Sequence, residues 1–189
     1  MFFKEYMIIN NKYSPPTFLE NSGGKLTTIN LNGIGKLEIS NVLENSVKSI
    51  QGENTVADLK FSSSSKDAII VTGHGADSVT LTDGKANLKT NNGDDFVSIL
   101  NGSDHYVETG NGNDNIEIVV GDNSVFSGSG NDVVVAEAGS NIISSGTQSD
   151  TVTINGGTNL IFAGADGDTI HVHDGTNTID GETGNDTLF

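Results

Sequence analysis

Aspartates recur at a fixed interval through most of the chain. Neighbouring members of this row are 18 residues apart, with a single step of 19. Repetition at a fixed period is typical of solenoids, in which equivalent residues of successive coils stack on one another. The row, called the Asp file below, consists of Asp77, Asp95, Asp114, Asp132, Asp150, Asp168 and Asp186.

Stacking would bring the carboxylates of the Asp file close together. Paired strands are about 4.8 Å apart, and each adjacent pair of charges at that spacing repels by roughly 1 kcal/mol in water and by several at an effective dielectric of about 20. We therefore expect a hard divalent cation between successive turns. Carboxylate and carbonyl oxygens suit Ca2+ better than Mg2+, which resists full dehydration. Any single Asp also fits an ordinary turn-forming role, but the common register of the row favours metal binding.

Glycines stand two and four positions before the aspartate in the most regular turns, as in Gly110-Asn-Gly112-Asn-Asp114. Glycine tolerates left-handed backbone angles and leaves room for carbonyl oxygens to converge on an ion. The expected metal-binding residues are Gly73, Gly75, Asp77, Gly93, Asp95, Gly110, Gly112, Asp114, Gly128, Gly130, Asp132, Asp150, Asp168 and Asp186.

A second row lies halfway between the aspartates and carries asparagine in the equivalent place. Stacked amides can hydrogen-bond along a column without net charge. We expect metal on the Asp side only and a neutral ladder on the other side. This second row, the Asn ladder, consists of Asn123, Asn141, Asn159 and Asn177.

The elements that would position both rows are short strands. From Phe61 onward, a Gly/Asx turn is followed by four or five alternating residues, as in Asp150-Thr-Val152-Thr-Ile154. Two such units make a coil of about 18 residues, with a strand on each side and a thin apolar core between them. A nine-residue unit has no room for the helix of a βαβ fold. We predict an all-β parallel β-roll, or β-helix solenoid, over residues 61–189; an antiparallel meander is the alternative.

Residues 1–60 do not follow the period. Strand-like alternation at Leu26–Leu31 and Lys36–Ile39 is interrupted by glycines. Repeat arrays need end caps, because a terminal coil exposes an apolar face and open strand edges. We predict that residues 1–60 form an irregular N-terminal β cap.

The composition restricts the partners. Twenty-five acidic residues against nine lysines give a formal charge of −16, and there is no arginine and no cysteine. We expect no binding to nucleic acid, since phosphate contacts need positive charge, and no disulfide or thiolate metal site. No run is long enough for a membrane span, and Met1–Asn10 lacks a signal-peptide cleavage site.

The turns Gly73-His-Gly75-Ala-Asp77, Gly110-Asn-Gly112-Asn-Asp114 and Gly128-Ser-Gly130-Asn-Asp132 resemble the RTX (repeats-in-toxin) family. The nonapeptide of that family is Gly-Gly-x-Gly-x-Asp-x-apolar-x, and its fold is a calcium-binding parallel β-roll. The resemblance spans roughly residues 72–189 and implies a single file of Ca2+ ions, because only alternate units keep Asp. It also implies a bacterial, secreted protein exported without an N-terminal signal. The glycine positions are occupied instead by Asn91, Gln148, Asp166 and Glu182 in four of the turns.

Three functions fit this pattern to different degrees. The first is a calcium-folded structural or adhesive module without enzymatic activity. Its last coil is expected to stack on the last coil of a second copy of the chain. The second is a β-helix enzyme, or its binding module, acting on acidic polysaccharide; the missing arginine and the negative charge disfavour it, and the pair His171 and His173 is expected to face solvent. The third is ice binding, which needs a uniform row of small side chains. The candidate row is mixed: His74, Asn92, Asn111, Ser129, Thr147, Ala165 and Thr183.

Overall fold

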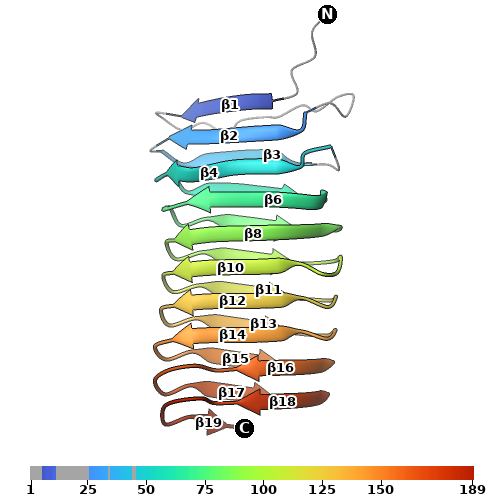
Figure 1. The fold of residues 1–189 in the computed structure, drawn as a ribbon, viewed down its shortest axis with the longest axis vertical. Coiled ribbons are helices and arrows are strands. Elements are labelled where there is room, and N and C mark those ends of the chain that lie inside the picture. The colour runs from blue at the N-terminus through green and yellow to red at the C-terminus, as the bar shows by residue number, and fades with distance from the viewer. Residues whose placement is uncertain (1–5, 12–25, 34, 44–45) are drawn as a thin grey trace, which may run out of the picture.

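The chain forms a parallel β-solenoid of about nine turns (Figure 1). The structure is a computed structural model that describes residues 6–11, 26–33, 35–43 and 46–189. Residues 1–5, which begin the stretch considered for a signal peptide, lie outside these ranges. Strands alternate along the chain between two sheets, and the described residues include no helix. The predicted fold class is confirmed.

The two sheets face each other across the core. The even-strand sheet, which also includes β1, contains ten strands: β1 (Tyr6–Asn11), β2 (Thr28–Gly33), β4 (Ser49–Thr55), β6 (Lys66–Gly73), β8 (Lys85–Asn92), β10 (Tyr106–Asn111), β12 (Ser124–Ser129), β14 (Ile142–Thr147), β16 (Thr158–Phe162) and β18 (Thr176–Asp180). The odd-strand sheet contains nine: β3 (Leu37–Leu43), β5 (Leu59–Ser63), β7 (Ser78–Leu81), β9 (Phe96–Ile99), β11 (Asn115–Ile118), β13 (Val133–Ala136), β15 (Thr151–Ile154), β17 (Thr169–Val172) and β19 (Thr187–Leu188).

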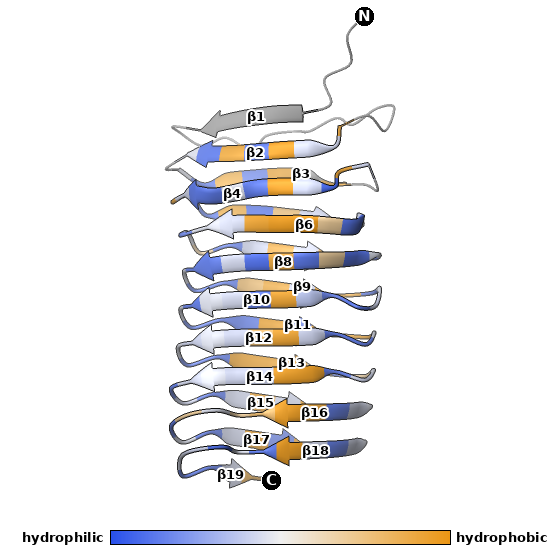
Figure 2. Cartoon of the chain, in the orientation of Figure 1, coloured by the Kyte–Doolittle hydropathy of each residue, from blue (hydrophilic) through white to orange (hydrophobic). Residues whose placement is uncertain are grey.

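The apolar rows fill the space between the sheets. Strand β11 pairs with β13 so that Ile116 lies beside Val134, and β12 pairs with β14 so that Val125 lies beside Ile143. All four side chains are fully buried. Figure 2 shows hydrophobic positions recurring from strand to strand along the stack. Each buried aliphatic side chain contributes roughly 1.5–3 kcal/mol to the stability of the fold, so the spacing of the apolar residues sets the length of a coil.

Strands from residues before 61 join the same two sheets with longer and less regular coils. Ile29 pairs with Ile50 and Leu37 with Leu59, offsets of 21 and 22 residues. Register shifts interrupt the pairing of β3 with β5 and of β4 with β6. The division of the chain at residue 60 stays a prediction.

The last coil is the most exposed part of the stack. Leu188 is 60% exposed and Phe189 68%. The Phe189 ring stacks on His171 with ring centroids 4.9 Å apart. The described part of the chain contains no helix that could span a membrane.

Candidate metal centre

The Asp file lies in the turns that lead from an even-numbered strand to the next odd-numbered strand, at the left edge of Figure 1. The parallel register places these turns on successive coils, so members that are 18 or 19 residues apart are neighbours in space. Asp186, in the last coil, is exposed. The other members are at most 2% exposed: Asp77, Asp95, Asp114, Asp132, Asp150 and Asp168.

Each carboxyl group in the file reaches back to the preceding coil through a single oxygen. The Asp95 N–H donates to Asp114 Oδ1 at 2.8 Å, and the Asp114 N–H donates to Asp132 Oδ1 at 2.8 Å. The same bond recurs from Asp77 to Asp186 with lengths of 2.7–3.0 Å. The other oxygen, Oδ2, is buried and has no hydrogen-bond partner in any of the six buried members.

The Asn ladder occupies the opposite edge and has the same backbone bond, but its second side-chain atom is satisfied. The Asn123 and Asn141 N–H groups each donate to the Oδ1 of the next Asn, at 3.2 and 3.1 Å. Asn141 Nδ2 also donates to Asn159 Oδ1 at 3.0 Å and to the Ala138 carbonyl at 3.1 Å. The predicted neutral ladder is present. The two edges therefore differ by one atom per coil, a donating amide on one side and an unpartnered oxygen on the other.

Burial raises the pKa of every buried carboxyl in the file. The pKa reaches about 6 for Asp77 and Asp114 and about 7 for Asp95 and Asp150. For Asp95, the charges of the neighbouring carboxylates add to the effect of burial, whereas the N–H donor to its Oδ1 opposes it. The pKa values of Asp132 and Asp168 are also raised, again chiefly by burial. At neutral pH, the file therefore holds charge at a desolvation cost that a proton or a cation would relieve.

Glycine lets adjacent turns stack in direct contact. An ideal Cβ on Gly112 would lie 1.9 Å from the Gly93 carbonyl oxygen, and one on Gly130 would lie 1.7 Å from the Gly112 carbonyl oxygen. Gly112 and Gly130 also have φ of 136° and 137°, in the region that L side chains rarely adopt. The four substitutions noted in the sequence keep a positive φ: 75° at Asn91, 78° at Gln148, 78° at Asp166 and 61° at Glu182.

The donor set fits a calcium ion between coils. Among the described residues, no three His, Asp or Glu side chains group closely enough to form a metal cluster. Two carboxylates from adjacent coils bracket each interval of the file, so a cation there would take its remaining oxygens from turn carbonyls or water. Calcium accepts such mixed sets of six to eight oxygens, and the unpartnered Oδ2 atoms would supply the charge.

Comparison with known families gives a match over the C-terminal part of the chain. The model of the RTX calcium-binding nonapeptide repeat (4 copies) matches residues 120–152 and 153–188. The resemblance predicted from the turn sequences is confirmed over residues 120–188. These residues include the entire Asn ladder and the last four members of the Asp file. No curated protein and no solved structure matches the chain.

The structure brings the predicted aspartates and turn glycines of residues 120–188, and of the coils before them, into one column. Their binding of metal stays a prediction. The mixed row considered for ice binding also stacks in register at this edge, with Thr147 beside Ala165 and Ala165 beside Thr183.

The sequence patterns did not predict two groups of buried polar side chains. One is His105, which takes the place of an Asn on the neutral edge. Its own N–H donates to Asn123 Oδ1 at 3.2 Å, and its Nδ1 accepts the Ala86 N–H at 3.1 Å. Its position 18 residues before Asn123 was the available signal. The second group is a column of buried hydroxyls, each bonded to a backbone carbonyl of the next coil: Thr72, Thr90, Thr109, Ser127 and Ser145.

Proposed function

We propose that this protein is a calcium-binding structural or adhesive repeat module of a secreted bacterial RTX-like protein, and that Ca2+ ions between successive turns stabilise its fold. The observation that carries the proposal is the contrast between the two edges. Every buried carboxyl of the Asp file has an unpartnered Oδ2, whereas the amides of the Asn ladder are bonded along the column.

The ions would sit in a single file. Seven aspartates on successive coils define six intervals, and each interval has a carboxyl group from either side. The terminal interval differs from the others because Asp186 is exposed. Turn carbonyls would complete the coordination, and the neutral edge would carry no ions.

Bound calcium would couple metal binding to folding. Buried carboxylates without a counter-charge oppose stacking of the coils, while the apolar core favours it. An ion that binds the stacked coils and not the unfolded chain stabilises the fold by mass action. The module therefore acts as a scaffold that becomes rigid where calcium is abundant, and it needs no catalytic group.

Calcium uptake tests this function directly. Chelator-treated protein is titrated with CaCl2 in a calorimeter, and its far-ultraviolet circular dichroism is recorded over the same titration. MgCl2 is the parallel control. We expect binding of several Ca2+ ions per chain, accompanied by a higher melting temperature, and a much smaller response to Mg2+. Protein that takes up no calcium, or whose melting temperature calcium leaves unchanged, would contradict the proposal.

Secretion and self-association are separate parts of the proposal with their own measurements. A fold that needs calcium suits a location outside the cell. The protein should therefore be found in the culture medium rather than in the cell fraction. The exposed side chains of the last coil, Leu188 and Phe189, support stacking on a second chain. Sedimentation velocity in calcium would show a dimer, and a strictly monomeric protein would exclude it.

A further inference from the structure

A hollow of about 280 Å3 opens on the outer face of the even-strand sheet, next to the edge that carries the Asn ladder. Tyr106, which is 37% exposed, and Ile142, which is 43% exposed, form two of its walls. Ser124 lies between them, because Tyr106 pairs with Ser124 and Ser124 pairs with Ile142. The hollow therefore arises where one coil places a small side chain between two large ones.

The spacing of the strands fits a single ring. The two walls belong to β10 and β14, which are two strand spacings apart, or about 9–10 Å. Carbon atoms in contact lie about 3.5–4.0 Å apart. A ring placed over Ser124 can therefore touch both walls, whereas two stacked rings would not fit between them.

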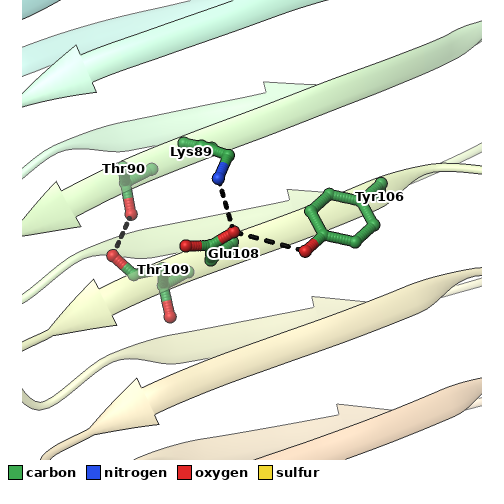
Figure 3. A network of polar contacts seen from close by, with 5 residues as sticks. All are labelled: Lys89, Thr90, Tyr106, Glu108 and Thr109. Carbon is green, nitrogen blue, oxygen red and sulfur yellow. Dashed lines mark hydrogen bonds and ion pairs between the residues drawn. The ribbon is translucent and has the colours of Figure 1, made fainter.

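The aromatic wall is held in place before any ligand binds. The Tyr106 ring packs against Phe126 with ring centroids 5.2 Å apart. The Tyr106 hydroxyl donates to Glu108 Oε2 at 3.3 Å, and Lys89 Nζ donates to the same oxygen at 2.7 Å. Figure 3 shows Tyr106 lying along its strand with the hydroxyl toward Glu108. A side chain fixed in this way loses little conformational entropy when a ligand stacks on it.

Hydrogen-bonding groups line the turn side of the hollow. They include Asp104, Asp122 and Ser140, all of them exposed. The Ser140 N–H donates to Asp122 Oδ1 at 2.7 Å, and the Asp104 N–H donates to the Asp122 carbonyl at 2.7 Å, so the two turns are tied together. Ionised carboxylates only accept hydrogen bonds, and these groups therefore match a ligand that carries several donors.

Charge restricts the ligand further. The chain has no arginine and no lysine after Lys89, and Lys89 is already paired with Glu108. An acidic sugar would meet two carboxylates without the basic partner that recognises its own carboxylate. An organic cation would suit the carboxylates, but the Ile142 wall offers it no favourable contact. A neutral sugar ring has apolar C–H faces for the two walls and hydroxyl donors around its rim, the combination that apolar sites with a few polar groups bind.

We propose that this hollow is a binding site for one ring of a neutral saccharide, which stacks between Tyr106 and Ile142 and donates hydrogen bonds to Asp104 and Asp122. This inference rests on the adhesive role proposed above and names the class of ligand for it. The site lies on the opposite edge from the Asp file, so its occupancy and calcium binding can be measured separately.

Titration with small sugars tests the inference. The probes are the methyl glycosides of glucose, galactose, mannose and N-acetylglucosamine, added to 15N-labelled protein in calcium. Methyl glucuronide is the anionic control, and tetramethylammonium chloride is the cationic control. We expect at least one neutral glycoside to shift the backbone amide signals of Tyr106, Ser124 and Ile142, with weak affinity because a single ring is bound. Neither control should shift them.

Two substitutions and a matched control locate the site. Tyr106→Ala removes the aromatic wall, and loss of such an anchor should weaken binding at least about tenfold. Ser124→Val fills the hollow, leaves both walls in place and suits a strand, so it should abolish binding and decides the question even if Tyr106→Ala does not fold. Phe162→Ala removes an aromatic ring from β16 of the same sheet, outside the hollow, and should leave the affinity unchanged.

The possible results separate this site from its alternatives. Neutral glycosides that shift none of the three signals overturn the inference, and so does equal binding by the wild type and Ser124→Val. Shifts caused by tetramethylammonium alone would make the hollow a cation site, and shifts that grow with protein concentration in the absence of sugar would make it a contact between copies of the chain; both results overturn the inference. Calcium uptake is measured on the same samples. Protein that binds calcium but no glycoside leaves the proposed calcium function intact, whereas protein that binds a glycoside but no calcium refutes that function alone.

Discussion

Replacing Asp114 by asparagine turns one coil of the Asp file into a copy of the neutral edge. Asp114 is 1% exposed, with its Oδ1 bonded and its Oδ2 unpartnered. The added Nδ2 can donate where Oδ2 cannot, as Asn141 does on the other edge. We therefore expect Asp114→Asn to stabilise the calcium-free protein at neutral pH and to reduce the stabilisation that calcium provides.

The size of the effect follows from the pKa. Burial raises the pKa of Asp114 from 3.8 to about 6. One pKa unit corresponds to about 1.4 kcal/mol, so keeping this group ionised in the folded state costs about 3 kcal/mol at a pH well above 6. Removing the charge recovers up to that amount when calcium is absent. When calcium is present, the variant loses a ligand from the two intervals on either side of residue 114.

The assay is urea denaturation followed by circular dichroism at pH 7.5, in chelator and in millimolar calcium. Glu117→Gln is the matched control, since it removes the same charge from the exposed face of the same coil. Asn141→Asp is the reverse exchange, and we expect it to destabilise the fold in chelator. The reasoning is refuted if Asp114→Asn is no more stable than Glu117→Gln in chelator, or if calcium stabilises both variants equally.

Two further predictions concern pH. Because the pKa values of the Asp file are raised, the folded chain holds protons between about pH 4 and about pH 7 that the unfolded chain has lost. The melting temperature in chelator should therefore fall as pH rises through this window, while calcium affinity should increase. A melting temperature in chelator that does not change with pH would contradict this. Burial lowers the pKa of His105, and its Nδ1 accepts an N–H, so this residue should destabilise the fold as pH falls below its unfolded pKa of about 6.5. His105→Asn, which extends the Asn ladder, should lose less stability between pH 7.5 and pH 5 in calcium than the wild type, with His173→Asn as the exposed control. Equal losses would show that folding leaves the pKa of His105 unchanged and would refute this prediction.

The sequence determined the fold and the chemical difference between the edges. The apolar period of about nine residues fixed two strands per coil, because only parallel stacking buries every member of the row, such as Ile116 and Val134. The same period fixed which side chains become neighbours in space. A column of Asp and a column of Asn could therefore be assigned to opposite edges from spacing alone, and the hydrogen-bonded ladder through Asn141 and Asn159 follows that assignment.

Only the tertiary structure decided how each oxygen is used. Spacing does not reveal that Asp114 Oδ1 accepts a backbone N–H while Oδ2 has no partner, because this depends on how far one coil lies from the next and on which way the turn faces. The burial of Thr109 and His105 was also hidden, because their hydrogen bonds to neighbouring coils form only when the coils stack. Burial by the neighbouring coils raises the pKa of Asp114, and it is set by contacts between coils that no single repeat contains.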